Sequence, residues 1–251
     1  MNKRTYRIGQ IVPSSNITME TEVPLMLSRA VVPNDVTFTF HSSRAPMKNV
    51  SAPELAAMNS HMERCARELS DARMDIIASA CLVAIMSQGA GYHRKTQAEL
   101  EAVCHVEAPD TQVITSAGAL VDSLKAIGTK RVSFITPYMK GLTELVAGYI
   151  ENEGIKVKDT ISLEIPNNLE VGAQDPKNLI EIVKRLDTSK VDAVVLSACV
   201  QMPSLSALAE VQKSFDVPVL STAAATVFQI LKALKLPTVV PDAGELLSGK
   251  Y

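Results

Sequence analysis

Short apolar runs and helical patterns alternate along the whole chain. Arg7 to Val12 and Val132 to Ile135 are apolar runs that lead into a proline, and the runs Asp75 to Ala80 and Val191 to Ser197 stop close to a cysteine. Each run reads as a buried strand, and the segments between them carry apolar residues at helical spacing. Strands that alternate with helices of these lengths predict parallel sheets covered by helices.

This pattern occurs twice. Segment 7–13 matches segment 131–137 as a basic residue, an apolar strand and a proline. Segments 75–81 and 192–199 both begin with an aspartate, continue with apolar residues and end in Ser-Ala-Cys. The matching segments lie about 120 residues apart, so we expect two similar halves.

The duplication predicts an α/β fold of two pseudo-symmetric, doubly wound lobes with parallel sheets and an active-site cleft between the lobes. We expect an N-terminal α/β lobe at residues 1–117 and a C-terminal α/β lobe at residues 118–225. Residues 226–251 are expected to form a helix end and a tail that packs back on the first lobe.

One helix has a clear predicted start. Ser51-Ala-Pro-Glu54 has the pattern of a capping box with proline just inside the helix. Apolar residues then follow at helical spacing from Leu55 to Leu69, so this segment is predicted to be one helix.

Composition narrows the function. The net charge is −2, which argues against nucleic acid or an acidic membrane as a partner, because those partners need a basic patch. No apolar run has the length of a membrane span, and the opening residues resemble no signal peptide. We therefore expect a cytoplasmic protein with four free thiols.

Two of those thiols are candidate catalytic groups. Cys81 and Cys199 occupy the same place in the duplicated unit, at the carboxyl end of a strand where ligand crevices form. Cys65 on a helix face and Cys104 at a helix end are predicted to be structural. The residues after Cys81 and after Cys199 look like helix starts, whose N–H groups favour a thiolate or hold a carboxylate.

Motifs for a bound metal or cofactor are lacking. Of the four histidines, His61 alone stands near a cysteine at a helical spacing, with Cys65, which is not a zinc-binding pattern. Gly89-Ala-Gly91 is too short for a dinucleotide fingerprint. We therefore expect no metal and no cofactor.

Three neutral hydrogen-bond donors are expected to line the cleft. Asn16, Tyr138 and Asn168 all fall in predicted loops at the carboxyl ends of strands. Each residue alone is weak evidence for a binding site, because an asparagine in a loop usually stabilises the turn itself. Together they could bind a small dicarboxylate.

The two halves, Pro-Ser-Ser-Asn16, Ser-Ala-Cys81-Leu-Val-Ala and Leu-Ser-Ala-Cys199-Val-Gln-Met-Pro resemble the aspartate/glutamate racemase superfamily and, within it, the maleate cis-trans isomerases. The resemblance covers roughly residues 5 to 235. The paired cysteines are shared across the superfamily, whereas their combination with Asn16, Tyr138 and Asn168 points to the isomerases.

The resemblance implies conversion of maleate to fumarate without a cofactor, as a late step in nicotinate degradation. Cys81 would be the nucleophile and Cys199 the proton donor and acceptor. Asn16, Tyr138 and Asn168 would bind the carboxylates. It also implies a homo-oligomer, most simply a homodimer. The small dicarboxylate substrate, maleate or fumarate, would be the ligand.

The residues alone leave other functions open. A two-cysteine amino-acid or hydantoin racemase, or an enzyme like arylmalonate decarboxylase, would use the same pair of thiols. A non-catalytic carboxylate-binding protein would use the same cleft. The duplicated pattern also does not say which thiol is the nucleophile, and this choice rests on the resemblance.

Overall fold

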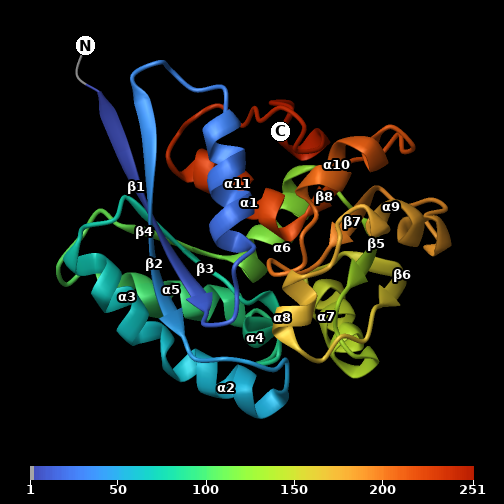
Figure 1. The fold of residues 1–251 in the computed structure, drawn as a ribbon, viewed down its shortest axis with the longest axis horizontal. Coiled ribbons are helices and arrows are strands. Elements are labelled where there is room, and N and C mark those ends of the chain that lie inside the picture. The colour runs from blue at the N-terminus through green and yellow to red at the C-terminus, as the bar shows by residue number, and fades with distance from the viewer. Residues whose placement is uncertain (1–2) are drawn as a thin grey trace.

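The computed structural model describes residues 3–251, which form two four-stranded sheets side by side (Figure 1). The strand orders are β2-β1-β3-β4 and β6-β5-β7-β8, and every pair is parallel. The strands are β1 (Arg4–Pro13), β2 (Val36–Ala45), β3 (Ile76–Ser79), β4 (Gln112–Thr115), β5 (Arg131–Thr136), β6 (Lys156–Ser162), β7 (Ala193–Ser197) and β8 (Val219–Ser221). The identical orders confirm the predicted duplication and the doubly wound α/β fold.

The repeated aspartates and arginines join neighbouring strands. The Asp75 carboxylate accepts a 2.7 Å hydrogen bond from the backbone N–H of Arg7, and Asp192 accepts one of 2.8 Å from Arg131. The arginine side chains donate in turn to backbone carbonyls just before β3 and β7. The same contacts therefore fix the central pair of strands in both sheets.

Helices cover the sheets on both faces, as the alternating pattern predicts. The first half contains α1 (Met19–Arg29), α2 (Ala52–Ser60), α3 (Met62–Asp71), α4 (Leu82–Met86), α5 (Tyr92–Cys104) and α6 (Ser116–Ala126). The second half contains α7 (Lys140–Asn152), α8 (Asn168–Gly172), α9 (Asn178–Ile182), α10 (Leu205–Gln212) and α11 (Thr222–Ala233), with short 3-10 turns at Val183–Arg185 and Glu245–Leu247.

The predicted single helix from Leu55 to Leu69 is wrong, because the chain breaks at His61 into α2 and α3. The capping box is also wrong, since Ser51 makes no side-chain bond to the helix. The Glu54 carboxylate instead accepts from the backbone N–H groups of Lys48 and Asn49, at 2.6 and 2.9 Å. It therefore holds the loop before the helix rather than the helix start.

Helix α11 leaves the second sheet and packs against α1, α6 and the strands β3 and β4 of the first (Figure 1). Ser221 caps it, as its side chain accepts from the N–H of Ala224 at 3.2 Å. Gln112 in β4 donates to the carbonyl of Ala233 at the helix end, at 3.2 Å. The end of the chain thus contacts the first lobe, while the division at residues 117/118 and 225/226 stays a prediction.

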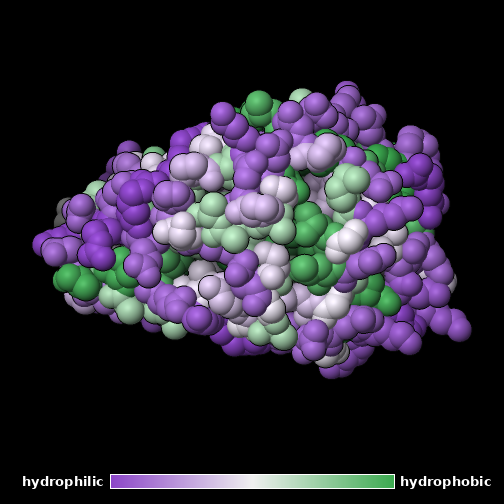
Figure 2. All heavy atoms as spheres, turned by 90° about the horizontal axis from the view of Figure 1, so that it is seen from below, coloured by the Kyte–Doolittle hydropathy of each residue, from purple (hydrophilic) through white to green (hydrophobic). Residues whose placement is uncertain are grey.

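Apolar residues are concentrated inside these layers. The surface seen from below is largely hydrophilic, with apolar side chains gathered toward the middle of that face (Figure 2). Within residues 3–251, no helix is both long and apolar enough to cross a membrane.

Candidate active site

Cys81 sits at a strained corner between β3 and α4. Its backbone has φ 75° and ψ 80°, in the left-handed region that non-glycine residues rarely occupy. Such strain costs on the order of 1–3 kcal/mol and often occurs at functional positions. As the sequence predicted, the next residue starts a helix.

Cys199 is held differently. The expected helix start directly after it is wrong, because α10 begins only at Leu205. The intervening loop supplies the donors instead, and the N–H of Gln201 lies 3.3 Å from the Cys199 sulfur. Unlike Cys81, Cys199 has no positive φ, so the structure breaks the symmetry that the sequence shows.

Both thiols are buried, with 7% of Cys81 and 6% of Cys199 exposed. Burial raises the pKa of Cys81 to about 12, against a smaller lowering by the Ala84 N–H group. Burial also raises the pKa of Cys199, opposed by the nearby Tyr138 hydroxyl and by the N–H groups of the loop that follows Cys199. The closed site therefore holds both groups as thiols.

The two cysteines line one cavity between the lobes, as predicted. The cavity is also lined by all three predicted donors, Asn16, Tyr138 and Asn168. Its free volume is only about 10 Å³, which is room for about one water molecule. A four-carbon dicarboxylate is larger, so the cavity must open to admit it.

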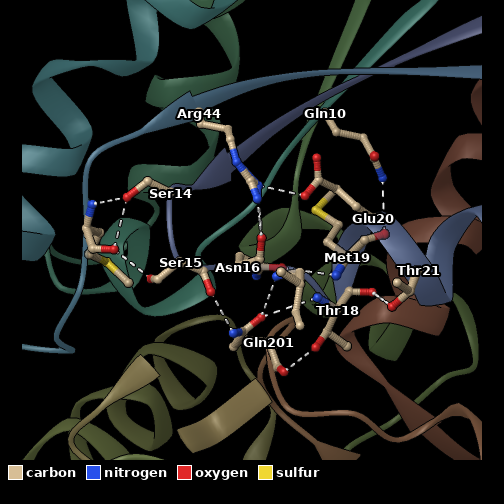
Figure 3. A network of polar contacts seen from close by, with 12 residues as sticks. Gln10, Ser14, Ser15, Asn16, Thr18, Met19, Glu20, Thr21, Arg44 and Gln201 are labelled. Carbon is tan, nitrogen blue, oxygen red and sulfur yellow. Dashed lines mark hydrogen bonds and ion pairs between the residues drawn. The ribbon is translucent and has the colours of Figure 1, made fainter. Parts of the chain in front are cut away.

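Asn16 is oriented by the start of α1. Its side-chain oxygen accepts from the N–H of Met19 at 3.0 Å, which leaves its NH₂ group to donate to a ligand. The Arg44 guanidinium donates to the Asn16 carbonyl at 2.9 and 3.1 Å and pairs with Glu20 (Figure 3). The loop that carries Asn16 is therefore fixed on the first sheet.

Tyr138 and Asn168 already take part in hydrogen bonds that close the cavity. The Tyr138 hydroxyl donates to the carbonyl of Ala198 at 3.3 Å, and burial raises the pKa of this tyrosine. The Asn168 side chain donates to the hydroxyl of Ser15 at 2.8 Å, from the second lobe to the first. Asn168 keeps a second N–H for an oxygen that enters the cavity, whereas Tyr138 can donate to such an oxygen only by giving up its hydrogen bond to Ala198.

The remaining lining of the cavity is mostly apolar and contains no Lys, Arg or His among the residues described: Pro13, Met47, Val50, Leu82, Val83, Val200 and Gln201. Carboxylates would be held here by neutral donors and backbone N–H groups. Such donors act strongly in a site that excludes water.

A larger hollow of about 890 Å³ lies elsewhere, around Arg4, Arg73 and Lys235. It adjoins the amino end of β1 and is lined by neither Cys81 nor Cys199. Ligands of open α/β sheets bind at the carboxyl ends of the strands, and the small interlobe cavity is therefore the candidate active site.

No group of three or more His, Cys, Asp or Glu side chains that could hold a metal ion is found in the described chain. The remaining two cysteines are buried away from the cavity, where Cys104 donates to the carbonyl of Ala66 at 3.8 Å. This packing agrees with the structural role predicted for Cys104.

Sequence reasoning missed Gln201 and Ser15. Gln201 joins the loops of both lobes, and Ser15 is the partner of Asn168. Both stand beside predicted site residues, but their partners are distant in sequence, so local pattern gives no sign of these contacts.

Comparison with known proteins identifies a clear set of relatives. The family described as arylmalonate decarboxylase matches residues 8–247. A maleate isomerase of Geobacillus stearothermophilus is 59% identical over 98% of both chains.

Solved structures agree with the sequence matches. The maleate isomerase Iso from Pseudomonas putida S16, as a Cys-to-Ala variant with maleate, is 54% identical over 99% of both chains, with a TM-score of 0.96. A Cys-to-Ser mutant of the Nocardia farcinica maleate cis-trans isomerase, with a covalently bound succinylcysteine intermediate, is 42% identical. The match covers 99% of this chain and 100% of that one, with a TM-score of 0.94.

Proposed function

The chain belongs to the arylmalonate decarboxylase family and, within it, to the maleate isomerases, and we propose that it converts maleate to fumarate with Cys81 as nucleophile and Cys199 as proton donor and acceptor. The observation that carries this assignment is the meeting of both thiols and three neutral donors in one buried interlobe cavity. The succinylcysteine intermediate of the Nocardia farcinica relative supports a covalent route.

The reaction begins with the thiolate of Cys81. Because the closed cavity favours the thiol, the proton leaves while the cleft is open to water. The thiolate then adds to one olefinic carbon of maleate, and the electron pair of the double bond moves onto the neighbouring carbon and its carboxylate. The left-handed corner at Cys81 places the sulfur at the cavity for this attack.

The resulting enediolate carries extra negative charge on one carboxylate. Asn16, Tyr138 and Asn168 would donate to the carboxylate oxygens and stabilise this charge. Protonation of the carbanion carbon by the Cys199 thiol gives a succinyl thioether on Cys81, in which C2–C3 is a single bond.

Rotation about C2–C3 then allows the trans product to form. The Cys199 thiolate removes the proton that it donated, the electron pair rebuilds the double bond, and the C–S bond to Cys81 breaks. Fumarate leaves with Cys199 as a thiol and Cys81 as a thiolate, the states in which the addition began, and Cys81 takes a proton back from water when it is not turning over. All atoms balance without a redox step.

The activity is tested by proton NMR of the purified protein with maleate. We expect the maleate olefinic signal to be replaced by that of fumarate, at a rate unchanged by prolonged chelation and dialysis. A protein that leaves maleate unaltered but racemises an amino acid or a hydantoin would instead be the two-thiol racemase. Binding of maleate without turnover would point to a carboxylate-binding protein.

Removal of the Tyr138 hydroxyl should weaken the reaction. Tyr138→Phe keeps the ring and deletes one donor. We therefore expect kcat/KM for maleate to fall by an amount that corresponds to a loss of about 1–3 kcal/mol in transition-state binding free energy. Tyr92→Phe is the matched control, because Tyr92 lies on α5 outside the cavity. A Tyr138→Phe enzyme as active as this control would remove Tyr138 from the site.

The proposal also includes a homodimer in the cytoplasm and a late step of nicotinate degradation. These parts rest on the sequence resemblance. Sedimentation of the purified protein measures the first of them, and a monomer at all concentrations would contradict it.

A further inference from the structure

Gln201 is a buried side chain that bonds to both lobes at once. Its amide oxygen accepts from the N–H groups of Ile17 and Thr18 in the first lobe, at 3.1 and 3.4 Å. Its NH₂ group donates to the carbonyls of Ser15 and Asn168, at 3.0 and 2.9 Å. Figure 3 shows the Gln201 amide beside the loop that carries Ser15 and Thr18. The residue is buried, with 2% of its surface exposed.

The backbone of Gln201 reaches the reacting sulfur and the first lobe as well. Its N–H lies 3.3 Å from the Cys199 sulfur, and its carbonyl accepts from the Thr18 hydroxyl at 2.7 Å. One residue therefore contacts the Cys199 thiol, the loop that carries Asn16 and the helix that carries Asn168.

We infer that Gln201 is a positioning residue for the isomerisation, which places the Cys199 thiol when the loops carrying Asn16 and Asn168 have closed. The inference rests on the proposed function. The cavity must open for a dicarboxylate to enter, and the contacts between Gln201 and the first lobe cross the gap that opens. When these contacts form on closure, they position the Cys199 thiol relative to the bound substrate.

Only an amide suits this place. The oxygen faces two N–H donors, and the NH₂ group faces two carbonyl acceptors, so neither a carboxylate nor an apolar side chain satisfies all four partners. Space is also restricted, because a Cβ added to Gly172 would lie 2.6 Å from the Gln201 amide nitrogen. The absence of a side chain at Gly172 thus leaves room for the amide.

The far end of the same loop is held independently. The carboxylate of Glu22 on α1 accepts from the N–H groups of Ser204 and Leu205, both at 2.7 Å. A change at Gln201 therefore leaves the loop anchored to the first lobe at its other end. This makes a folded Gln201 variant with a displaced Cys199 the expected outcome.

The test is Gln201→Met, which keeps the length of the side chain and removes its amide. A displacement of about 1 Å in a reacting group can cost about 100-fold in rate, so we expect kcat to fall by about 10- to 100-fold. The succinyl adduct should accumulate above the wild-type level in acid-quenched samples, because its breakdown needs Cys199 in place to remove the proton, whereas the reactive enediolate can also take its proton from water. A purely structural role would lower activity and adduct together with the folded fraction, measured by circular dichroism.

Gly172→Ala gives a second test that leaves the amide in place. Its added methyl group pushes on the amide nitrogen, so the same combination of lower kcat and more adduct is expected, to a smaller extent. Gly148→Ala in α7 is the matched control, since nothing lies within 4 Å of the added Cβ, and its kcat should stay at the wild-type value.

The outcomes separate the two proposals. A wild-type protein that does not isomerise maleate would reject the proposed function itself. An active wild type, with folded Gln201→Met and Gly172→Ala proteins that keep wild-type kcat or lose it without a rise in adduct, would overturn the role of Gln201. If Gln201→Met fails to fold, Gly172→Ala decides by the same two measurements.

Discussion

Replacing Cys199 by serine should stop turnover while the covalent adduct still forms. Serine is close in size but is a far weaker acid and its alkoxide is not available as a base, so proton removal from the adduct loses its catalyst, while water can still protonate the reactive enediolate. General acid–base catalysis contributes about 10²- to 10⁴-fold, and we expect kcat to fall by that range. Intact-protein mass spectrometry after incubation with maleate should show a gain of one maleic acid.

The matched control for this variant is Cys104→Ser. Cys104 is a buried thiol outside the cavity, and a serine hydroxyl can still donate to the carbonyl of Ala66. Its kcat should remain close to the wild-type value. Wild-type activity in Cys199→Ser would reject the two-thiol mechanism, whatever the adduct level.

Replacing Cys81 by serine should abolish both turnover and the adduct. An alcohol is a much poorer nucleophile than a thiolate at neutral pH, and no bond to the olefinic carbon can form without it. We expect kcat to fall by at least about 10³-fold, since loss of a nucleophile removes the whole covalent route. Proton NMR gives the turnover and mass spectrometry the adduct.

Both serine variants are expected to lose turnover, and the presence of the covalent adduct is what distinguishes them. If Cys81→Ser accumulates a succinyl group on Cys199, the roles of the two thiols are reversed. Unchanged circular dichroism spectra of both variants exclude unfolding as the reason for lost activity.

Much of the fold could be predicted because the sequence contains its plan twice. The Asp-to-Ser-Ala-Cys runs and the Arg-to-Pro strands are local patterns, and the contacts of Asp75 with Arg7 and of Asp192 with Arg131 show why they recur. The break at His61 could not be predicted, because the apolar helical spacing continues through it from α2 into α3.

The candidate site also has features that the sequence predicts and features that it does not. Cys81 and Cys199 were expected to face one cleft because both follow a strand's carboxyl end, and they line one cavity. The left-handed backbone of Cys81 has no sequence signal at a non-glycine residue. The contacts of Gln201 join residues more than 180 positions apart, a distance at which periodicity carries no information.

Mapping the adduct in wild-type enzyme tests the assignment of the two thiols most directly. Enzyme quenched in acid during turnover of maleate is digested, and the peptides that contain Cys81 and Cys199 are compared by mass spectrometry. We expect the succinyl group on the Cys81 peptide and an unmodified Cys199 peptide. A succinyl group on Cys199, with Cys81 unmodified, would contradict the assignment of Cys81 as the nucleophile.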